Sequence, residues 1–468
     1  MNFDPAAFVT TLAAVGIVIV VATLISGVLD KRAVPAVGVF LLLGLLVGPA
    51  GLGLFDVSLR SAALGAIATI ALTLVLFTDA LGIDRNAIRR NLWLAAAVLG
   101  PGTLLSALLI SGAAWWLLDL PIPLAAILGA ALASTDPVMM RGLLRRPGVP
   151  APARVALSVE SGLNDVVVLP IVLVATAFLG PSLPSAGEVG RVALNVFLVG
   201  PAMGAAIGLG AVRSLEWMRG RIGLRRDYES LYVLGVAFAA YAAAETVHAS
   251  GFMAAFSAGL VVALLDVELC DCFKDYGEAT SEMFLLFSFV ALGTSLIWAG
   301  LEALTPATLA FAAVALFGRS VVLRVATARL DPDSRRYVVW FGPRALSSLL
   351  LVLLPVFFGV TEAERLWPVA ALVVLLSVAI HGGMLMAWQR QLGVRAPVTD
   401  SVLIKIGEYR NLVGTGARIR LLDVRATRAY EMDDLTATGS LRIDPDRPVE
   451  SAAALALPKE DWLIAYCA

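Results

Sequence analysis

The chain has 468 residues, of which 59% are hydrophobic and 15% are charged, and its mean hydropathy is +0.87. Soluble globular proteins carry about 25% charged residues, so this composition excludes a single soluble domain and a disordered chain. The net charge of −1 excludes a broad basic surface for nucleic acid, and three cysteines are too few for a disulfide framework. The sequence therefore predicts a polytopic membrane protein.

Apolar runs long enough to cross a bilayer recur along most of the chain. A transmembrane helix needs about 20 apolar residues. Dividing the runs at charged and turn-forming residues predicts thirteen spans, at 7–29, 34–54, 61–82, 92–118, 122–141, 152–179, 190–212, 228–247, 250–267, 280–299, 306–328, 337–359 and 366–389. The first span has an acidic flank and a long apolar stretch, so we expect it to be retained rather than cleaved as a signal peptide.

Lysine and arginine are distributed unequally between alternate loops. If the N-terminus lies outside, the inward loops hold most of these residues, and the outward loops hold only Arg60, Arg191 and Arg365. Positively charged residues concentrate in cytoplasmic loops. We therefore expect a multi-pass protein of the inner membrane, with its N-terminus outside and its C-terminus in the cytoplasm.

The fifth span contains the sequence Ser134-Thr135-Asp136-Pro137. Pro137 lacks an N–H group and disfavours helical dihedrals at Asp136, so we expect the helix to unwind here. Carbonyls freed in this way, such as that of Thr135, are tolerated only where they face protein or a water-filled cavity. Thr135 and Asp136 are therefore candidate cation ligands. The alternative is a proline kink that Asp136 caps locally.

The sixth span contains Glu160, Ser161, Asn164 and Asp165. Ser161 and Asp165 are four residues apart and share a helix face, with Glu160 and Asn164 in the adjacent row. Oxygen ligands of this kind suit a monovalent cation, and a carboxylate removed from water also holds a proton more readily. One carboxylate that binds either a cation or a proton, but not both, is sufficient for exchange. The alternative is a polar network that only joins helices.

The twelfth span contains Gly342-Pro343-Arg344, which predicts a second broken helix. Under this topology the fifth and twelfth spans cross the membrane in opposite directions, as in transporters with inverted repeats whose broken helices meet at the substrate site. An arginine buried in the membrane needs an acidic partner. We expect Glu160 or Asp136 to pair with Arg344.

Other polar residues in the spans are less specific. Asp79, near the inner end of the third span, lines the cation route or lies at the interface, and Arg319 either lines the pathway or extends to the inner surface. His381 is expected to be a packing histidine. Glu245 and His248 are expected to face water at the outer end of the eighth span.

Together, these motifs resemble those of the monovalent cation/proton antiporters, specifically the bacterial Na⁺/H⁺ exchanger branch of the first subfamily. The resemblance covers about residues 5–390 and also includes Leu292-Gly293 and the stretch from Ser250 to Ala254. Two positions depart from the family pattern. Asp79 is displaced by one from the acid that usually precedes two glycines, and Ala345 stands where a glycine is usual.

The resemblance implies an all-α fold with inverted repeats, in which spans 4–6 and 11–13 form a moving six-helix core and the other spans form a dimerising scaffold. It implies that Asp165 carries the cation or the proton, and that Ser161 and Thr135 add ligands while Asn164 steadies the site. Glu160 and Arg344 would form a structural ion pair. The Asn-Asp pair is similar to that of the electroneutral class, which exchanges one cation for one proton.

Residues 398–468 are predicted to form a separate α/β cytoplasmic segment. The stretch from Leu421 to Arg425, with Gly439-Ser440 and the stretch from Leu463 to Cys467, resembles the first part of a rhodanese-like domain. That resemblance implies a structural pair of Asp423 and Arg425. The active-site loop that would follow Cys467 is missing, so we expect no sulfurtransferase activity, and the segment is either regulatory, oligomerising or without a role in transport.

These observations predict a secondary transporter rather than an enzyme, with an antiporter domain at residues 1–392. We expect exchange of Na⁺ for H⁺ by alternating access, in the service of pH homeostasis, in a lipid bilayer and as a homodimer. Monovalent cations and protons are then substrates, and no cofactor or other metal is expected. The alternatives are a K⁺/H⁺ antiporter or K⁺-efflux relative, a passive channel, and a membrane-anchored sulfur-handling or sensory protein.

Overall fold

The computed structural model describes residues 16–21, 23–24, 36–54, 56–83, 89, 91–136, 139–140, 144, 149–180, 184–221, 226–265 and 271–391, together with parts of the C-terminal region, namely 409, 412–415, 418–425, 430, 436–444, 451–452, 454–455 and 461–466. The chain divides into two compact units, unit 1 at Met1–Ala396 and unit 2 at Pro397–Ala468. This division falls between the two predicted domains, 1–392 and 398–468.

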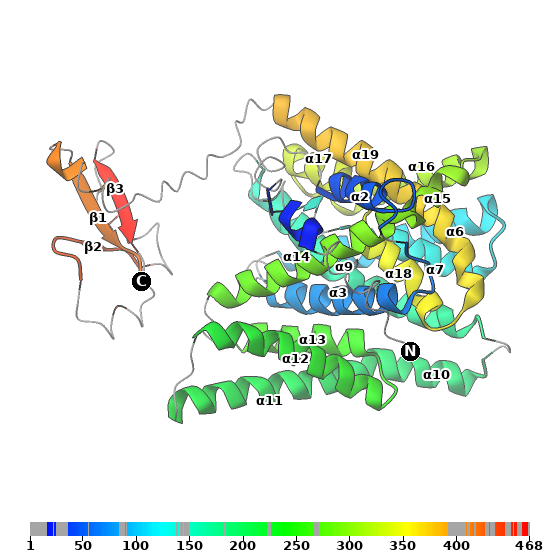
Figure 1. Cartoon of the computed structure of the whole chain (residues 1–468), viewed down its shortest axis with the longest axis horizontal. Coiled ribbons are helices and arrows are strands. Elements are labelled where there is room, and N and C mark those ends of the chain that lie inside the picture. The colour runs from blue at the N-terminus through cyan, green and yellow to red at the C-terminus, as the bar shows by residue number, and fades with distance from the viewer. Residues whose placement is uncertain are drawn as a thin grey trace. The chain divides into compact units, whose positions relative to one another are not determined.

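Unit 1 is helical throughout its regular elements (Figure 1). Its elements are α2 (Ala36–Val47), α3 (Ala62–Leu81), α5 (Leu92–Ala97), η1 (Val98–Leu105), α6 (Ser106–Leu117), α7 (Ile122–Ala133), α9 (Ala151–Ala177), α10 (Ala186–Leu194), η2 (Asn195–Val199), α11 (Gly200–Arg221), α12 (Arg226–Thr246), α13 (Gly251–Leu264), α14 (Asp271–Thr294), η3 (Leu296–Trp298), α15 (Ala299–Glu302), α16 (Pro306–Ala326), α17 (Pro332–Trp340), α18 (Leu346–Phe357), η4 (Thr361–Leu366) and α19 (Trp367–Gln391).

The predicted spans from the second to the thirteenth each coincide with one or more of these helices. Among the described residues, six helices are long and apolar enough to cross a membrane, or seven if the pair bent by 60° after Thr294 is one span. Five shorter apolar helices accompany them. The first predicted span, 7–29, lies largely outside the described residues, so the total of thirteen stays a prediction.

The fifth and twelfth spans are interrupted, as predicted from their prolines. Helix α7 ends at Ala133, and Ser134 continues as extended chain with φ −61° and ψ 140°. Helix α17 ends at Trp340, and the chain becomes helical again only at Leu346. Pro137 itself lies outside the described residues.

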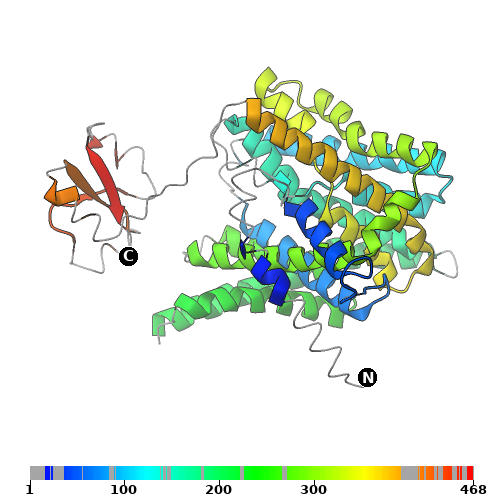
Figure 2. The ribbon, with the colours of Figure 1, turned by 45° about the horizontal axis from the view of Figure 1, so that its top comes forward.

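Close helix packing surrounds these interrupted spans. Helices α11, α12 and α13 pack side by side, and α13 and α12 both contact α3. The three helices form one side of unit 1 in both Figure 1 and Figure 2. Helix α2 packs equally closely on α14. At that crossing a Cβ on Gly44 would come within 2.3 Å of the Val290 carbonyl oxygen, so only glycine permits this separation of the two backbones.

Unit 2 contains a three-stranded parallel sheet with the strand order β2-β1-β3. Its strands are β1 (Ile419–Asp423), β2 (Leu441–Arg442) and β3 (Trp462–Tyr466). At the end of β1 the buried Asp423 carboxylate accepts hydrogen bonds from Arg425 and from the Tyr466 hydroxyl. The expected pair of Asp423 and Arg425 is therefore present. The rhodanese-like assignment stays a prediction, and Cys467 lies outside the described residues.

Candidate functional site

The two interrupted spans meet at their breaks, and Asp136 joins them. Its backbone N–H donates to the Pro343 carbonyl at 2.9 Å, and its Oδ2 accepts the backbone N–H of Leu346 at 2.9 Å. Its Oδ1 accepts the N–H of Met139 at 3.2 Å. Asp136 therefore caps the chain after its own break and also the start of α18, because both helix starts leave backbone N–H groups without helical partners. Asp136 thus makes capping contacts, including one beyond its own span, and a part for Asp136 in cation binding stays a prediction.

Helix α9 presents Asp165 and Asn164 to the extended segment that follows α7. The hydroxyl of Ser134 donates to Asp165 Oδ1. The Asn164 amide donates to Thr135 Oγ1 at 2.8 Å and to the Thr135 carbonyl at 3.3 Å. These side chains fix the unwound segment to α9, so the structure brings Thr135, Asn164 and Asp165 together as the sequence predicted.

Two acceptor oxygens at this contact lack hydrogen-bond partners among the described residues, namely Asp165 Oδ2 and Asn164 Oδ1. Both residues are almost completely buried, and Ser347 and Asp136 are also close to the Asp165 carboxylate. A buried oxygen without a partner is costly unless a proton or a cation satisfies it. The oxygen-rich donor set therefore fits a monovalent cation or a proton.

Ser161 and Asp79 are less directly placed at this site. Ser161 is buried, and its hydroxyl donates at 3.4 Å to the Ser158 carbonyl of its own helix. The Cβ atom of Asp79 lies 3.9 Å from the position that a Cβ on Gly162 would occupy. Asp79 therefore lies against α9 at Gly162. The ligand role of Ser161 and the pathway role of Asp79 stay predictions.

The partner of Glu160 differs from the one we expected. Both carboxylate oxygens of Glu160 accept hydrogen bonds from the guanidinium of Arg319, and this ion pair is buried. Bidentate pairs of this kind combine strength with a fixed geometry. The prediction that Glu160 pairs with Arg344 is therefore wrong. The prediction that Arg319 could extend to the inner surface is also wrong, because only 3% of its side chain is exposed.

Arg344 is instead held by carbonyls of its own break and of α16. Its Nη1 donates to the Gly342 carbonyl at 3.1 Å and its Nη2 donates to the Ala315 carbonyl at 3.4 Å, and its Nε has no hydrogen-bond partner among the described residues. Its backbone N–H donates to the Ser377 hydroxyl at 2.7 Å. Among the described residues this guanidinium therefore forms no ion pair and is held by backbone carbonyls.

Position 342 must be a glycine because the guanidinium of Arg319 lies against it. A Cβ at this position would lie 2.5 Å from Arg319 Nη1 and 2.7 Å from its Cζ. The Gly342 position therefore decides whether the Arg319 guanidinium can reach Glu160. The sequence indicated this glycine only as a helix breaker.

Two serine hydroxyl groups at the site were not among the cation ligands predicted from the sequence. Ser134 is bonded to Asp165, and Ser347 is near it. Their positions in the sequence could have indicated them. Ser134 precedes Thr135 in the first unwound segment, and Ser347 follows the second unwound segment. Among the described residues, no group of three His, Cys, Asp or Glu side chains could hold a metal ion.

Comparison with known proteins assigns the chain to a family. Residues 16–390 match the family described as sodium/hydrogen exchanger, transmembrane. The chain belongs to this family. The family expected from the motifs is thus confirmed, and it is a family of transporters rather than enzymes.

Individual exchanger relatives agree with this assignment. The chain is 27% identical over 384 residues to a protein named K(+)/H(+) antiporter NhaP from Alkalimonas amylolytica, covering 81% of this chain but only 65% of that protein. It is 29% identical to the Na(+)/H(+) antiporter NhaH of Halobacillus aidingensis, covering 63% of this chain and 74% of that protein.

A solved structure shows the same fold. The structure of the sodium proton antiporter MjNhaP1 from Methanocaldococcus jannaschii matches with a TM-score of 0.64 at 20% identity, covering 80% of this chain and 99% of that one. The exchanger fold therefore extends over unit 1, and the matched region does not account for the whole length of the NhaP relative.

Proposed function

We propose that this protein exchanges a monovalent cation for H⁺ across the inner membrane by alternating access. One observation carries the proposal: the buried carboxylate of Asp165 lies beside the crossing of two broken helices, and its Oδ2 has no hydrogen-bond partner in the part of the chain that the structure describes. Substrate sites of transporters with inverted repeats lie at such crossings, where unwound backbone and polar side chains replace the water around an ion.

The exchange follows from the charge of Asp165. An ionised carboxylate is costly to move through the membrane interior, whereas its protonated and cation-bound forms are neutral. The core therefore moves only when Asp165 holds a proton or a cation, which couples the two fluxes. Thr135 and Ser161 supply further oxygens, and the Asn164 amide stays bound to Thr135. Because Asn164 adds no second charge, one cation exchanges for one proton.

The transported ion is proposed to be Na⁺, with K⁺ as the alternative. One relative is named a K(+)/H(+) antiporter and another a Na(+)/H(+) antiporter, so both cations occur among the names. The proposal also includes a homodimer, an N-terminus outside the cell and a C-terminus in the cytoplasm. The loop arginines support this orientation.

Everted membrane vesicles provide the test. After respiration has acidified the lumen, addition of Na⁺, K⁺ or Li⁺ should collapse the pH gradient in vesicles with the wild-type protein. Asp165→Asn should abolish this response for every ion, whereas Asp333→Asn, which removes an exposed carboxylate of α17, should leave it unchanged. No response to any of the three ions by the inserted wild-type protein, or a normal response by Asp165→Asn, would contradict the proposal.

A further inference from the structure

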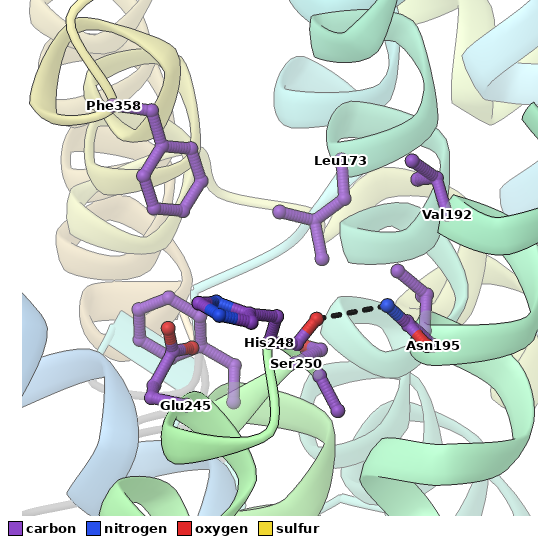
Figure 3. A pocket seen from close by; sticks show the side chains of 10 residues that line it. Leu173, Val192, Asn195, Glu245, His248, Ser250 and Phe358 are labelled. Atoms are coloured by element: carbon purple, nitrogen blue, oxygen red, sulfur yellow. Dashed lines mark hydrogen bonds between the residues drawn. The ribbon is translucent and has the colours of Figure 1, made fainter. Parts of the chain in front are cut away.

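A pocket lies apart from Asp165, at the opposite end of α9 from Pro150. Its volume is about 280 Å³. Leu173 of α9 and Phe358 after α18 line one side, and Asn195, Glu245 and His248 line the other (Figure 3). The first pair belongs to two of the three spans that form the Asp165 site. The pocket therefore lies where these spans meet the rest of unit 1.

The pocket lies in line with the carrier site along one helix. Leu173 follows Asp165 by eight residues on α9, which corresponds to about 12 Å at 1.5 Å per residue. The pocket is at the end of α9 that the loop arginines place outside. An ion that passed between this face and Asp165 would move along the same boundary between helices.

Glu245 gives the pocket a carboxylate with one free oxygen. Its Oε1 accepts the Gly251 backbone N–H at 3.0 Å, and its Oε2 has no hydrogen-bond partner among the described residues. On the adjoining helix α10, Glu188 and Arg191 carry opposite charges that compensate each other. Glu245 therefore leaves the pocket with a net negative charge between apolar walls, and such walls concentrate the electric field of a charge.

The backbone around His248 is unusual and fixes the pocket wall. His248 has a φ of +57°, in the left-handed region that non-glycine residues rarely adopt. Its carbonyl accepts the Asn195 amide at 2.9 Å, and the next N–H, from Ala249, donates to the Ala244 carbonyl at 2.9 Å. Figure 3 shows the imidazole of His248 beside the carboxylate of Glu245, with the Phe358 ring facing the same space.

We infer that this pocket is the outer vestibule of the transport route, in which Glu245 captures a hydrated monovalent cation before the ion reaches Asp165. The inference rests on the proposed exchange function. A water molecule takes up about 30 Å³, so the pocket has room for an ion with several waters of its hydration shell. Both sides of the pocket must separate or close when the core moves, which places the captured ion at the moving boundary.

Sided transport measurements test the vestibule. In right-side-out vesicles, Glu245→Gln should raise the KM for Na⁺ supplied from outside by about three- to tenfold, because the field that concentrates cations is lost. In the wild-type protein the same field also concentrates protons at the pocket. In Glu245→Gln the outer proton concentration that half-inhibits Na⁺ uptake should therefore rise by the same factor. The exchange equilibrium should be unchanged. The KM for Na⁺ supplied to the cytoplasmic face, measured in everted vesicles, should not change.

Three controls separate capture from a general structural effect. Glu245→Asp keeps the charge and should retain the wild-type KM, whereas Glu302→Gln removes an exposed carboxylate of α15 outside the pocket and should have no effect. The difference in the KM for outside Na⁺ between wild type and Glu245→Gln should become smaller when choline chloride raises the outer ionic strength, because salt screens the charge of Glu245.

An unchanged outer KM in Glu245→Gln, an equal change on both faces, or an equal change in Glu302→Gln would overturn the vestibule. In each of these cases wild-type exchange, and its loss in Asp165→Asn, still supports the proposed function. If the wild-type protein shows no exchange, both the proposed function and the vestibule fail.

Discussion

The carboxylate of Asp136 accepts the backbone N–H of Leu346, a residue 210 positions further along the chain, at 2.9 Å. The reverse link is made by the Asp136 N–H and the Pro343 carbonyl. Asp136 thus binds the middle of the second break and the first turn of the helix that follows it. These two hydrogen bonds, one from its backbone and one to its side chain, link the two broken helices at their crossing.

Replacing Asp136 should therefore destabilise the crossing. Asp136→Asn keeps one acceptor oxygen but turns an NH₂ group toward a buried backbone N–H, which costs about 1–3 kcal/mol for the unsatisfied donor. We expect a lower melting temperature of the purified protein in detergent. Asp333→Asn, at the exposed start of α17, is the control and should melt as the wild type does. Equal melting of both variants would contradict the capping role.

The pairing of Glu160 can be measured with double-mutant cycles. Glu160→Gln or Arg319→Gln alone leaves a buried charge without its partner, which costs roughly 3–5 kcal/mol. The double variant should lose much less than the sum of the single losses, because neither charge remains. The same cycle with Arg344→Gln should give a smaller coupling energy, since Arg344 forms no ion pair with Glu160. Stronger coupling to Arg344 than to Arg319 would show the assignment to be incorrect.

Gly342 should tolerate no side chain. Gly342→Ala places a methyl group 2.5 Å from Arg319 Nη1, so the guanidinium must shift away from Glu160 or the second break must move. We expect a loss of about 1–3 kcal/mol in stability, as for other overpacked sites, together with slower exchange. Gly383→Ala, on α19, meets nothing within 4 Å and should leave stability and exchange near the wild-type values. A fully stable and active Gly342→Ala protein would contradict this reading of the glycine.

Unit 2 should lose stability in acid through Asp423. Hydrogen bonds from Arg425 lower the pKa of this carboxyl group from 3.8 to about 2. Because the pKa is lower in the folded state, the stabilisation is present above the unfolded value and is lost as the pH falls from about 4 toward 2. The protection of the β1 and β3 amides in the full-length protein, measured as their exchange rate relative to that of an unstructured chain at the same pH, should therefore fall over this interval. In Asp423→Asn this protection should already be lower at neutral pH and should change less with acidification.

The breaks and the carrier helix were predictable because they depend on local chemistry. Pro343 lacks an N–H wherever the helix lies, and residues four apart, such as Ser161 and Asp165, share a face in any helix. The partner of Glu160 was not predictable in this way. Whether Arg319 or Arg344 reaches Glu160 depends on the rotation of α16 against α9. It also depends on the hydrogen bond that Arg344 donates to the Gly342 carbonyl of its own span. Packing between distant segments determines both.

The outer pocket shows the same limit. Glu245 and His248 were expected to face water because they end a span, and both are indeed exposed. Their pocket is formed only when α9, η2, the start of α13 and the end of α18 come together. The spacing of residues within α12 does not predict that these elements meet.

The bonds between the two breaks also limit how an ion can be selected. The segments at Ser134 and Ser348 are tied to each other and to α9, so the oxygens around Asp165 have little freedom to contract around a smaller ion or to spread around a larger one. In the proposed exchange cycle these oxygens would move together and would offer the same coordination distances to the outside and to the cytoplasm. The preference for Na⁺ or K⁺ would then depend on the fixed spacing of the crossing, and substitutions that lengthen or shorten these hydrogen bonds should change which ion is preferred.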